Sequence, residues 1–356
     1  MTIWNACLVT AVVIALGLLA TVRHVLAAED ASAPTATPGK PYTLEVPFGL
    51  EDLASYIPKD NPLTVEKLEL GKLLFFDPRL SADNKVACGS CHFPFMAWTD
   101  GQKVSIGIRG QLASRNGMTI VNRVYSTAQL WDGKSPSLEA QALNPIFMSV
   151  RMGMPSPEAV LKKLNAIKGY RERFHQVFGT DVTLDGVGKA LASFERTILS
   201  GNSPADEFDM GGEEDAISES AKRGLTIFQT KGRCARCHSG FNFTDEKYHN
   251  LGIDWDTQNV NVGRYTITGE EDQIGAFKTP TLREISKTSP YMHDGRFVTL
   301  EEVIEFYDKG GIQNPHLDNT MVPLNLTPEE KKDLVEYLHA LNGEGYQMDI
   351  PAKFPQ

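Results

Sequence analysis

The chain has 356 residues, a length that suits two domains better than one small module. Hydrophobic residues make up 41% of the sequence and charged residues 22%, which is the composition of a folded globular protein and argues against global disorder. The formal net charge of −10 argues against a protein that binds nucleic acid by electrostatic attraction.

The chain begins with an apolar stretch, residues 7–22, that has the length of a signal peptide and is short for a membrane span. Ala27 and Ala28 provide the small residues of a cleavage site, although no Lys or Arg precedes the stretch. We expect residues 1–28 to be a signal peptide, with an uncleaved membrane anchor as the alternative. Residues 29–41 are rich in Pro, Ala, Ser and Thr and are expected to form a linker.

Beyond the linker, the hydrophobic pattern is mainly α-helical, and strand patterns are short and scattered. Apolar residues recur at helical spacing over six segments: 63–76, 157–164, 184–199, 218–228, 300–307 and 328–341. Side chains that can cap a helix N-terminus stand at the start of five segments: Thr64, Thr183, Ser218, Thr299 and Thr327. The last of these begins a capping box that ends at Glu330.

The body of the chain repeats one design. Each half has a CxxCH motif that follows a helical segment, and matching residues then recur at an offset of 162 positions. The matches are Thr119 with Thr281, Asp132-Gly133 with Asp294-Gly295, and Leu138-Glu139 with Leu300-Glu301. The second copy is longer because of a polar loop over about residues 245–272. The sequence thus predicts two domains, 42–203 and 204–356, joined near residues 200–204.

Four of the five cysteines lie in the two motifs, Cys88-Gly-Ser-Cys91-His92 and Cys234-Ala-Arg-Cys237-His238. Two cysteines at this spacing can form thioether bonds to the two vinyl groups of one haem, and the adjacent His then reaches the iron. A zinc site would need four ligands in one place, and a redox disulfide does not need the following His. The motifs therefore predict two covalently bound haem c groups, with His92 and His238 as proximal iron ligands.

The sixth iron position decides the chemistry, because an iron with two strong protein ligands transfers electrons whereas an iron with an open face can bind peroxide. Tyr307 stands in the second copy at the position that Pro145 holds in the first. Since proline cannot ligate iron, the repeat favours a second haem closed by Tyr307 and a first haem that stays open. The competing interpretation of Tyr307 is an aromatic residue packed in the core.

The two CxxCH units and five further motifs resemble the bacterial di-haem cytochrome c peroxidase and MauG family over about residues 45–345. The motifs are Ser114-Arg115-Asn116, Trp131-Asp132-Gly133, Gln141-Ala-Leu-Asn-Pro145, Thr279-Pro-Thr-Leu-Arg283 and Pro290-Tyr-Met-His-Asp-Gly295. The resemblance implies a periplasmic, mainly α protein of two tandem cytochrome c-like domains, each with one covalent haem c. It also implies an oxidoreductase that reacts with hydrogen peroxide.

The resemblance assigns roles around and between the haems. Tyr307 lies fourteen residues after the His of the Pro-Tyr-Met-His-Asp-Gly motif, where many family peroxidases have a Met ligand and MauG has a Tyr. Tyr307 is therefore expected to ligate the second iron. Trp131 matches a tryptophan between the haems that can relay an electron or a hole. Asn116, with the main-chain oxygens of Thr288 and Pro290, matches a calcium site between the domains.

Gln141 and Pro145 match positions over the open face of the first haem. Where the family has an acid–base Glu, this chain has Arg151, which can stabilise negative charge but cannot act as a base at neutral pH. Three explanations stay open: Arg151 belongs to a different pocket, Glu158 substitutes for the missing acid, or peroxide turnover is slow. Ile108 replaces a displaceable His of other members, so no reductive activation is expected.

The remaining histidines have no ligand-like spacing and are interpreted as surface or locally hydrogen-bonded residues: His175, His249, His316 and His339. His293 is a motif residue that we expect near the second haem but not as an iron ligand.

Three functions stay open. The first is peroxide reduction at the haem of His92, with electrons from a small periplasmic donor such as a cytochrome c or a cupredoxin. The second is MauG-like, peroxide-dependent oxidation of a side chain in a partner protein, which Tyr307 favours. The third is plain electron transfer. Gly232 replaces a Trp that MauG carries before its second CxxCH, so amine-dehydrogenase maturation is not expected. The sequence leaves the oligomeric state open.

Overall fold

The computed structural model describes residues 39–256, 258 and 260–356, which belong to one compact unit. The predicted signal peptide and most of the predicted linker lie outside the described residues. Within these residues, no helix is both long enough and apolar enough to cross a membrane.

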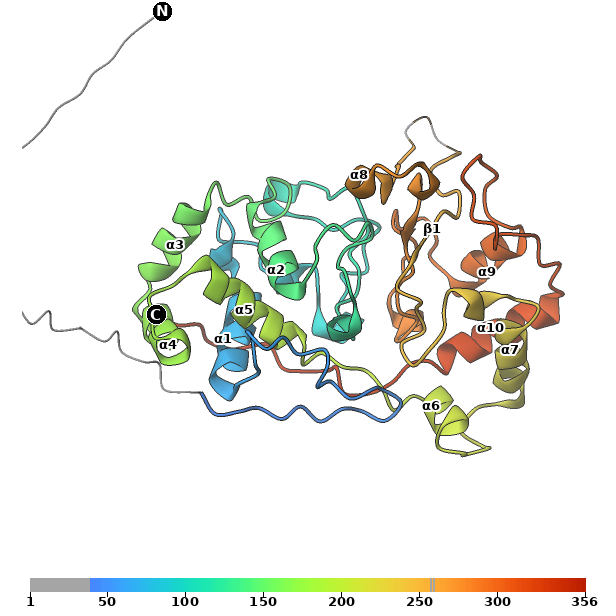
Figure 1. Ribbon diagram of the computed structural model, residues 1–356, viewed down its shortest axis with the longest axis horizontal. Helices are drawn as coiled ribbons and strands as arrows, with labels where there is room; N and C mark the ends of the chain where they lie inside the picture. Colours follow the sequence, from blue (N-terminus) through green and yellow to red (C-terminus); the bar gives the residue numbers. More distant parts are fainter. Residues whose placement is uncertain (1–38, 257, 259) are drawn as a thin grey trace, which may run out of the picture. The chain divides into compact units, whose positions relative to one another are not determined.

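The described residues form ten α-helices and one two-stranded sheet (Figure 1). The helices of the first half are α1 (Val65–Phe76), α2 (Leu138–Phe147), α3 (Pro157–Asn165), α4 (Lys168–Phe178) and α5 (Leu184–Glu195). Those of the second half are α6 (Pro204–Asp209), α7 (Glu219–Gln229), α8 (Tyr265–Thr268), α9 (Leu300–Asp308) and α10 (Pro328–His339). Strands β1 (Tyr248–His249) and β2 (Phe277–Lys278) pair antiparallel, with Tyr248 opposite Lys278.

All six helices expected from the hydrophobic spacing are present, and the five expected capping side chains accept backbone hydrogen bonds. Thr327 and Glu330 form the expected capping box at the start of α10. α5 ends at Glu195, before the predicted end at residue 199. The pattern missed α2, α4, α6 and α8, because α2 contains Pro145, α4 is rich in charged residues, and α6 and α8 have only six and four residues.

Each half is built around one close crossing of two helices. α1 packs against α5, and α7 packs against α10. A glycine permits each crossing: a Cβ atom at Gly71 would lie 2.0 Å from the carbonyl oxygen of Ala190, and one at Gly224 would lie 2.0 Å from that of Asp333. The two halves therefore use the same packing device, as the internal repeat predicts.

The end of the chain contributes to the core of the first half. Trp98 is fully buried there, and its Nε1 donates a hydrogen bond to the carbonyl oxygen of Tyr346 at 2.9 Å. The backbone N–H of Gly169 donates to Gln356, and the C-terminus lies beside α4 in Figure 1. The segment after α10 therefore packs against the first half, although the prediction assigns it to the second domain. The domain limits 42–203 and 204–356 stay a prediction.

The two halves also contact each other through buried groups. Arg283 is 1% exposed and binds both carboxylate oxygens of Asp206 in α6 while donating to the carbonyl oxygen of Gly49. The rings of Tyr125 and Phe241 meet edge to face, with centroids 4.8 Å apart. These contacts fix the first half against the second, so residues from both can contribute to one site.

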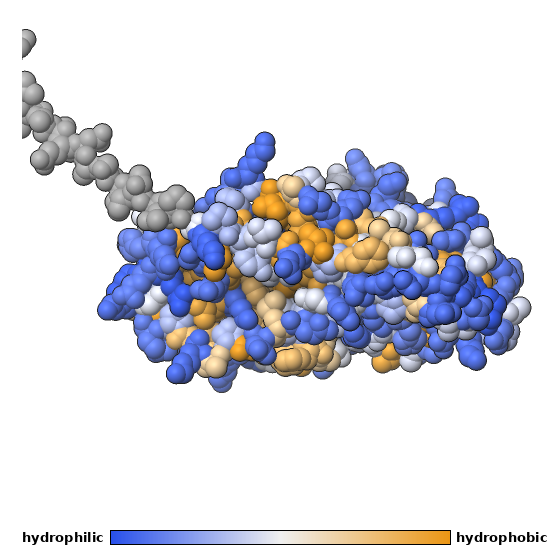
Figure 2. Space-filling view, turned by 90° about the horizontal axis from the view of Figure 1, so that it is seen from below, coloured by the Kyte–Doolittle hydropathy of each residue, from blue (hydrophilic) through white to orange (hydrophobic). Residues whose placement is uncertain are grey.

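The surface is mostly polar, in keeping with the charge of the chain. The face shown in Figure 2 is hydrophilic over most of its area and carries a cluster of apolar residues near its middle. Among the described residues, the large apolar side chains of Phe95, Leu112 and Val298 are each more than 60% exposed.

Candidate active site

The first CxxCH motif forms a short 3-10 turn, Cys88–Ser90, beside a cavity of about 40 Å³. Cys88 and Cys91 are free thiols, and burial raises the pKa of both. Nδ1 of His92 hydrogen-bonds to the carbonyl oxygen of Trp98 at 3.1 Å, and burial lowers the pKa of the imidazole. Because a carbonyl can only accept, Nδ1 carries the proton and the lone pair of Nε2 is free to bind a metal.

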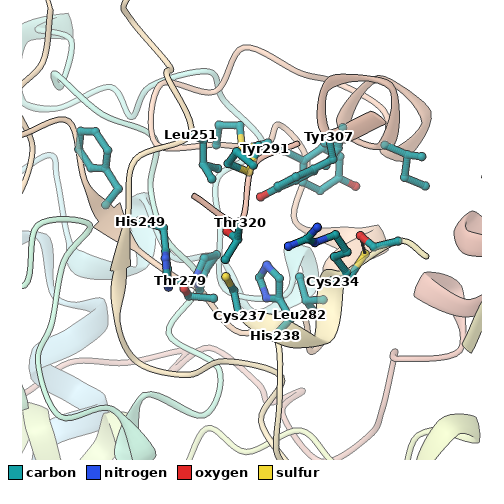
Figure 3. Close-up of a pocket in the computed structure, with 18 of the residues that line it drawn as sticks. Cys234, Cys237, His238, His249, Leu251, Thr279, Leu282, Tyr291, Tyr307 and Thr320 are labelled. Carbon is teal, nitrogen blue, oxygen red and sulfur yellow. Dashed lines mark hydrogen bonds between the residues drawn. The ribbon is translucent and has the colours of Figure 1, made fainter. Parts of the chain in front are cut away.

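The second CxxCH motif repeats this geometry in the turn Cys234–Arg236. Nδ1 of His238 hydrogen-bonds to the carbonyl oxygen of Phe243 at 3.0 Å, so Nε2 is again the free nitrogen. Burial lowers the pKa of His238 and raises that of Cys234 to about 12. The adjacent cavity is larger, about 180 Å³, and Figure 3 shows both cysteines and His238 on one side of it.

Tyr307 lines the second cavity across from His238 (Figure 3). It lies near the end of α9, whose start is fixed by a capping box between Thr299 and Glu302. Burial raises the pKa of the Tyr307 phenol, and the thiols of the CxxCH motif add to the effect. A ferric ion has the opposite influence, because a bound cation favours the phenolate. Tyr307 thus lies in the same cavity as His238, and its role as an iron ligand stays a prediction.

The chemical groups around both cavities are those that a covalently attached haem requires. Each presents two unbridged thiols at CxxC spacing and an imidazole whose Nε2 is free, and apolar side chains make up most of the lining. These are the groups that attach a c-type haem and ligate its iron. Cys88, Cys91 and His92 would hold one haem, and Cys234, Cys237 and His238 the other.

Gln141 and Pro145, both on α2, line the first cavity together with His92 and Arg151. The structure therefore removes one of the three explanations for Arg151, namely that it belongs to a different pocket. The carbonyl oxygen of Arg151 accepts a hydrogen bond from the N–H of Ile108 at 2.7 Å, which ties the two loops together.

Glu158, the expected substitute for the missing acid, is exposed in the first turn of α3. It is not among the residues that line the first cavity. The physical reason is the N-terminal position of Glu158 in α3, which buries Val160 and Leu164 and leaves the first turn in solvent.

Trp131 lies where the two halves meet. Its Nε1 donates to the carbonyl oxygen of Asn116 at 3.0 Å, and its own carbonyl accepts from the N–H of Lys278 in β2 at 2.8 Å. Its indole ring lines the second cavity and meets the ring of His293 edge to face, with centroids 6.4 Å apart. His293 also lines this cavity, as expected, and hydrogen-bonds to Asp254.

Asn116 is tied to segments of both halves. Its side-chain amide donates to the carbonyl oxygens of Gln102 and Lys103, at 3.0 and 3.3 Å. Its backbone N–H donates to the carbonyl oxygen of His293 at 2.8 Å, three residues beyond Pro290. The amide nitrogen is thus occupied and the side-chain oxygen is left for another partner. Calcium ligation by Asn116, Thr288 and Pro290 stays a prediction.

His249 forms the local hydrogen bonds that the sequence suggested, with Asp245 at 2.9 Å and Asp318 at 2.6 Å. The bond to Asp245 is the largest cause that raises the pKa of His249, to about 11. Metal-binding atoms of Cys237, Asp245 and His249 lie within 4.8 Å of one another. Cys237 belongs to the CxxCH motif and both ring nitrogens of His249 are already used, so this cluster is an ion pair beside the second cavity.

Sequence reasoning missed Glu195, the last residue of α5, which is 5% exposed and lines the first cavity. Burial raises the pKa of its carboxyl group to about 8. A signal was present, because Glu195 interrupts the apolar face of the predicted helix four residues after Leu191.

Residues 65–215 match the family model described as di-haem cytochrome c peroxidase, and residues 221–342 match the cytochrome c model. MauG of Methylorubrum extorquens is 40% identical over 296 residues, which cover 83% of each chain. The chain belongs to the di-haem cytochrome c peroxidase and MauG family. Another relative, cytochrome-c peroxidase IdrP1 of Pseudomonas sp. strain SCT, is 35% identical over 317 residues that cover 80% of this chain and 83% of that one.

Solved structures agree with this assignment. A MauG-like protein associated with microbial copper homeostasis matches with a TM-score of 0.74 and 30% identity, over 88% of this chain and 96% of that one. The di-haem peroxidase BthA of Burkholderia thailandensis shares the fold, with a TM-score of 0.74 at 20% identity over the same shares of the two chains. The predicted fold is confirmed: the chain is mainly α-helical and has two cytochrome c-like domains.

Family membership also confirms that the chain is an oxidoreductase that uses peroxide, and it supports one haem c in each domain. It does not decide which haem meets peroxide, which residue closes the other haem, or where the electrons go.

Proposed function

We propose that the protein reacts with hydrogen peroxide in the first cavity, opposite His92, and exchanges electrons through a second haem held by His238 and Tyr307. When bound, a c-type haem supplies an iron that changes oxidation state and, with one axial position open, can bind peroxide. The observation that carries the proposal is the difference between the residues opposite the two proximal histidines. The phenol of Tyr307 lines one cavity, and an amide and a proline line the other, whereas each cavity has one guanidinium.

The residues opposite His92 are suited to a small polar substrate. Gln141 can donate and accept a hydrogen bond, and Arg151 can only donate and keeps its positive charge. The ring of Pro145 offers no donor and no ligand atom, so it leaves space open. Together these residues would orient peroxide and favour its hydroperoxide anion, because a fixed positive charge stabilises developing negative charge.

Trp131 supports electron exchange between the two sites. It lines the second cavity and is held by Asn116 from the first half and Lys278 from the second. A half-buried aromatic ring, held by hydrogen bonds of its indole nitrogen and of its own backbone carbonyl, offers a relay with a fixed position. The same contacts stabilise the interface between the halves, and the two roles do not exclude each other.

MauG-like oxidation of a partner protein is the second candidate, and Tyr307 favours it. An anionic phenolate stabilises oxidised iron, which makes the second haem a poor acceptor of electrons from a cytochrome c. Relatives named MauG and relatives named cytochrome-c peroxidase both match this chain. The electron donor of the first candidate would be a small periplasmic protein, and export to the periplasm and the calcium ion at Asn116 belong to the same proposal.

Counting exogenous ligands tests the proposal. Cyanide binds a haem iron that has an open axial position, so the ferric holoprotein should bind one cyanide per chain. Tyr307→Phe removes the phenolate and should bind two. Tyr291→Phe is the matched control, because Tyr291 is another tyrosine that lines the same cavity, and this variant should bind one cyanide. Two cyanides in the wild type, or one in Tyr307→Phe, would overturn the assignment.

A further inference from the structure

Among the described residues that line the first cavity, Glu195 is the one carboxylic acid. It ends α5, which packs against α1 and α2 (Figure 1). The residue is 5% exposed, and no described residue donates a hydrogen bond to its carboxyl group. Its carboxyl oxygens are not among the fully buried polar atoms that lack a partner, so they are open to the cavity that the residue lines. The carboxyl group is therefore available to a molecule bound in the cavity.

The charged groups around Glu195 are mostly engaged elsewhere. Arg196 pairs with Glu139 of α2 at 2.8 Å. Arg123 donates to Gln129 at 2.8 Å. Burial is the largest cause that raises the pKa of Glu195, and the negative charge of Glu139 raises it further. The positive charges of Arg196 and Arg123 lower it, and the net result is a pKa raised to about 8. The acid is therefore protonated at neutral pH.

Three further residues of the cavity bear on the chemistry of this acid. Arg151 faces the same cavity, and α1 contributes the apolar ring of Phe75. Cys88 also lines the cavity, and it carries no charge once it is joined to a haem. The cavity thus combines a permanent cation, which cannot release a proton, with a protonated acid, which can.

We propose that Glu195 donates a proton to peroxide in the first cavity and so replaces the acid that is absent at position 151. The proposal rests on the proposed function, because it requires peroxide to bind opposite His92. Reduction of one hydrogen peroxide to two waters consumes two protons and two electrons. The electron donor of the peroxidase reaction supplies the electrons. The Glu195 proton goes to the oxygen that leaves first as water, and the second proton comes from solvent to the other oxygen, which becomes the second water. The carboxylate then regains a proton from solvent.

Glu195→Gln tests this role, because it keeps the shape of the side chain and removes the proton. Glu158→Gln is the matched control, the same change at an exposed position of the same half. Both variants should carry two haems. Glu195→Gln should react with peroxide about 10² to 10⁴ times more slowly, the usual contribution of a positioned acid. The wild-type rate should fall above about pH 8, and this fall should be absent in Glu195→Gln.

A second readout does not depend on turnover. Difference infrared spectra with and without cyanide should contain a protonated carboxylic acid band that shifts on binding. That band should be missing in Glu195→Gln and present in Glu158→Gln. A wild-type peroxide rate in Glu195→Gln would overturn the proposal and leave the proposed function intact. A wild-type holoprotein that does not react with peroxide would overturn both.

Glu195→Asp keeps the test decisive if the Gln variant loses its haem. This variant retains the carboxylic acid but withdraws it by one methylene group. The reaction with peroxide should therefore be slower, while its rate should still fall at alkaline pH. A rate equal to that of the wild type at every pH would contradict direct proton donation. If the role of Glu195 were purely structural, its substitution would change neither the pH dependence of the peroxide rate nor the infrared band that shifts when cyanide binds.

Discussion

The two cavities share one proximal design and differ on the opposite side. In each, Nδ1 of the CxxCH histidine donates a hydrogen bond to a nearby backbone carbonyl oxygen. The acceptor is Trp98 in the first half and Phe243 in the second. α2 and α9 start at equivalent positions of the repeat, yet α2 brings Pro145 to its cavity and α9 brings Tyr307. The comparison teaches that the repeat preserves the geometry of the CxxCH motif, while single residues on one helix differ between the two cavities.

The largest expected effect comes from removing one haem at a time. Cys88→Ser with Cys91→Ser should leave one haem per chain and abolish the reaction with peroxide. Cys234→Ser with Cys237→Ser should also leave one haem, but cyanide should still bind in the first cavity. Intact mass gives the haem count, and ligand titration gives the open site. Peroxide reactivity that survives only in the first double variant would reverse the roles of the two cavities.

Substitution at the two helix crossings tests whether the halves share their architecture. A Cβ at Gly71 or at Gly224 would lie 2.0 Å from a backbone oxygen of the facing helix, so alanine must push the helices apart. Each substitution should lower the free energy of unfolding by about 1–3 kcal/mol, the range for overpacked cores. Urea unfolding of the holoprotein measures this. A loss at one glycine only would show that the two crossings are not equivalent.

Substitution of one arginine at a time should show whether each cavity contributes to anion binding. Arg151 lines the first cavity and Arg233 the second. Arg151→Ala should weaken azide binding about tenfold or more, because hydrogen bonds to charged groups contribute about 1.5–3 kcal/mol. Arg233→Ala should leave azide affinity unchanged, since Tyr307 closes that haem. Equal affinities in the wild type and Arg151→Ala would show that the guanidinium does not contact the ligand.

The smallest expected effect is a pH dependence confined to the second half. Hydrogen bonds to Asp245, Cys237 and Asp318 raise the pKa of His249 to about 11, and the bond to Asp245 has the largest effect. A pKa that is higher in the folded state stabilises that state at low pH. The stabilisation is complete below the pKa of the unfolded state, about 6.5, and is lost as pH rises through about 11. The melting temperature of His249→Gln should therefore fall below that of the wild type by more at pH 6 than at pH 10. An equal difference at both pH values would contradict an imidazolium at this position.

Local signals explain what could be predicted from the sequence. Thr64 and Thr327 act as caps because a capping side chain accepts a hydrogen bond from a backbone N–H three residues further along the chain. The CxxCH motif can be recognised in the sequence for a similar reason, since its cysteines and histidine are close neighbours along the chain. Glu158 was a wrong candidate for the missing acid, because sequence proximity to Arg151 does not decide which side chain reaches the cavity. Glu195 lies 44 residues beyond Arg151 and lines the cavity with it.

The sequence by itself determined the helical class, the two-fold repeat, and the cysteines and histidines that would hold two haems. These features depend on covalent spacing and on helical periodicity, which act over a few residues. Only the tertiary structure decided which side chains line a cavity with His92, because Gln141, Arg151 and Glu195 come to one cavity only when α2 and α5 pack together. It also decided that the segment around Tyr346 returns to the first half and packs against Trp98. Such contacts depend on the shape of the whole core, which no local pattern encodes.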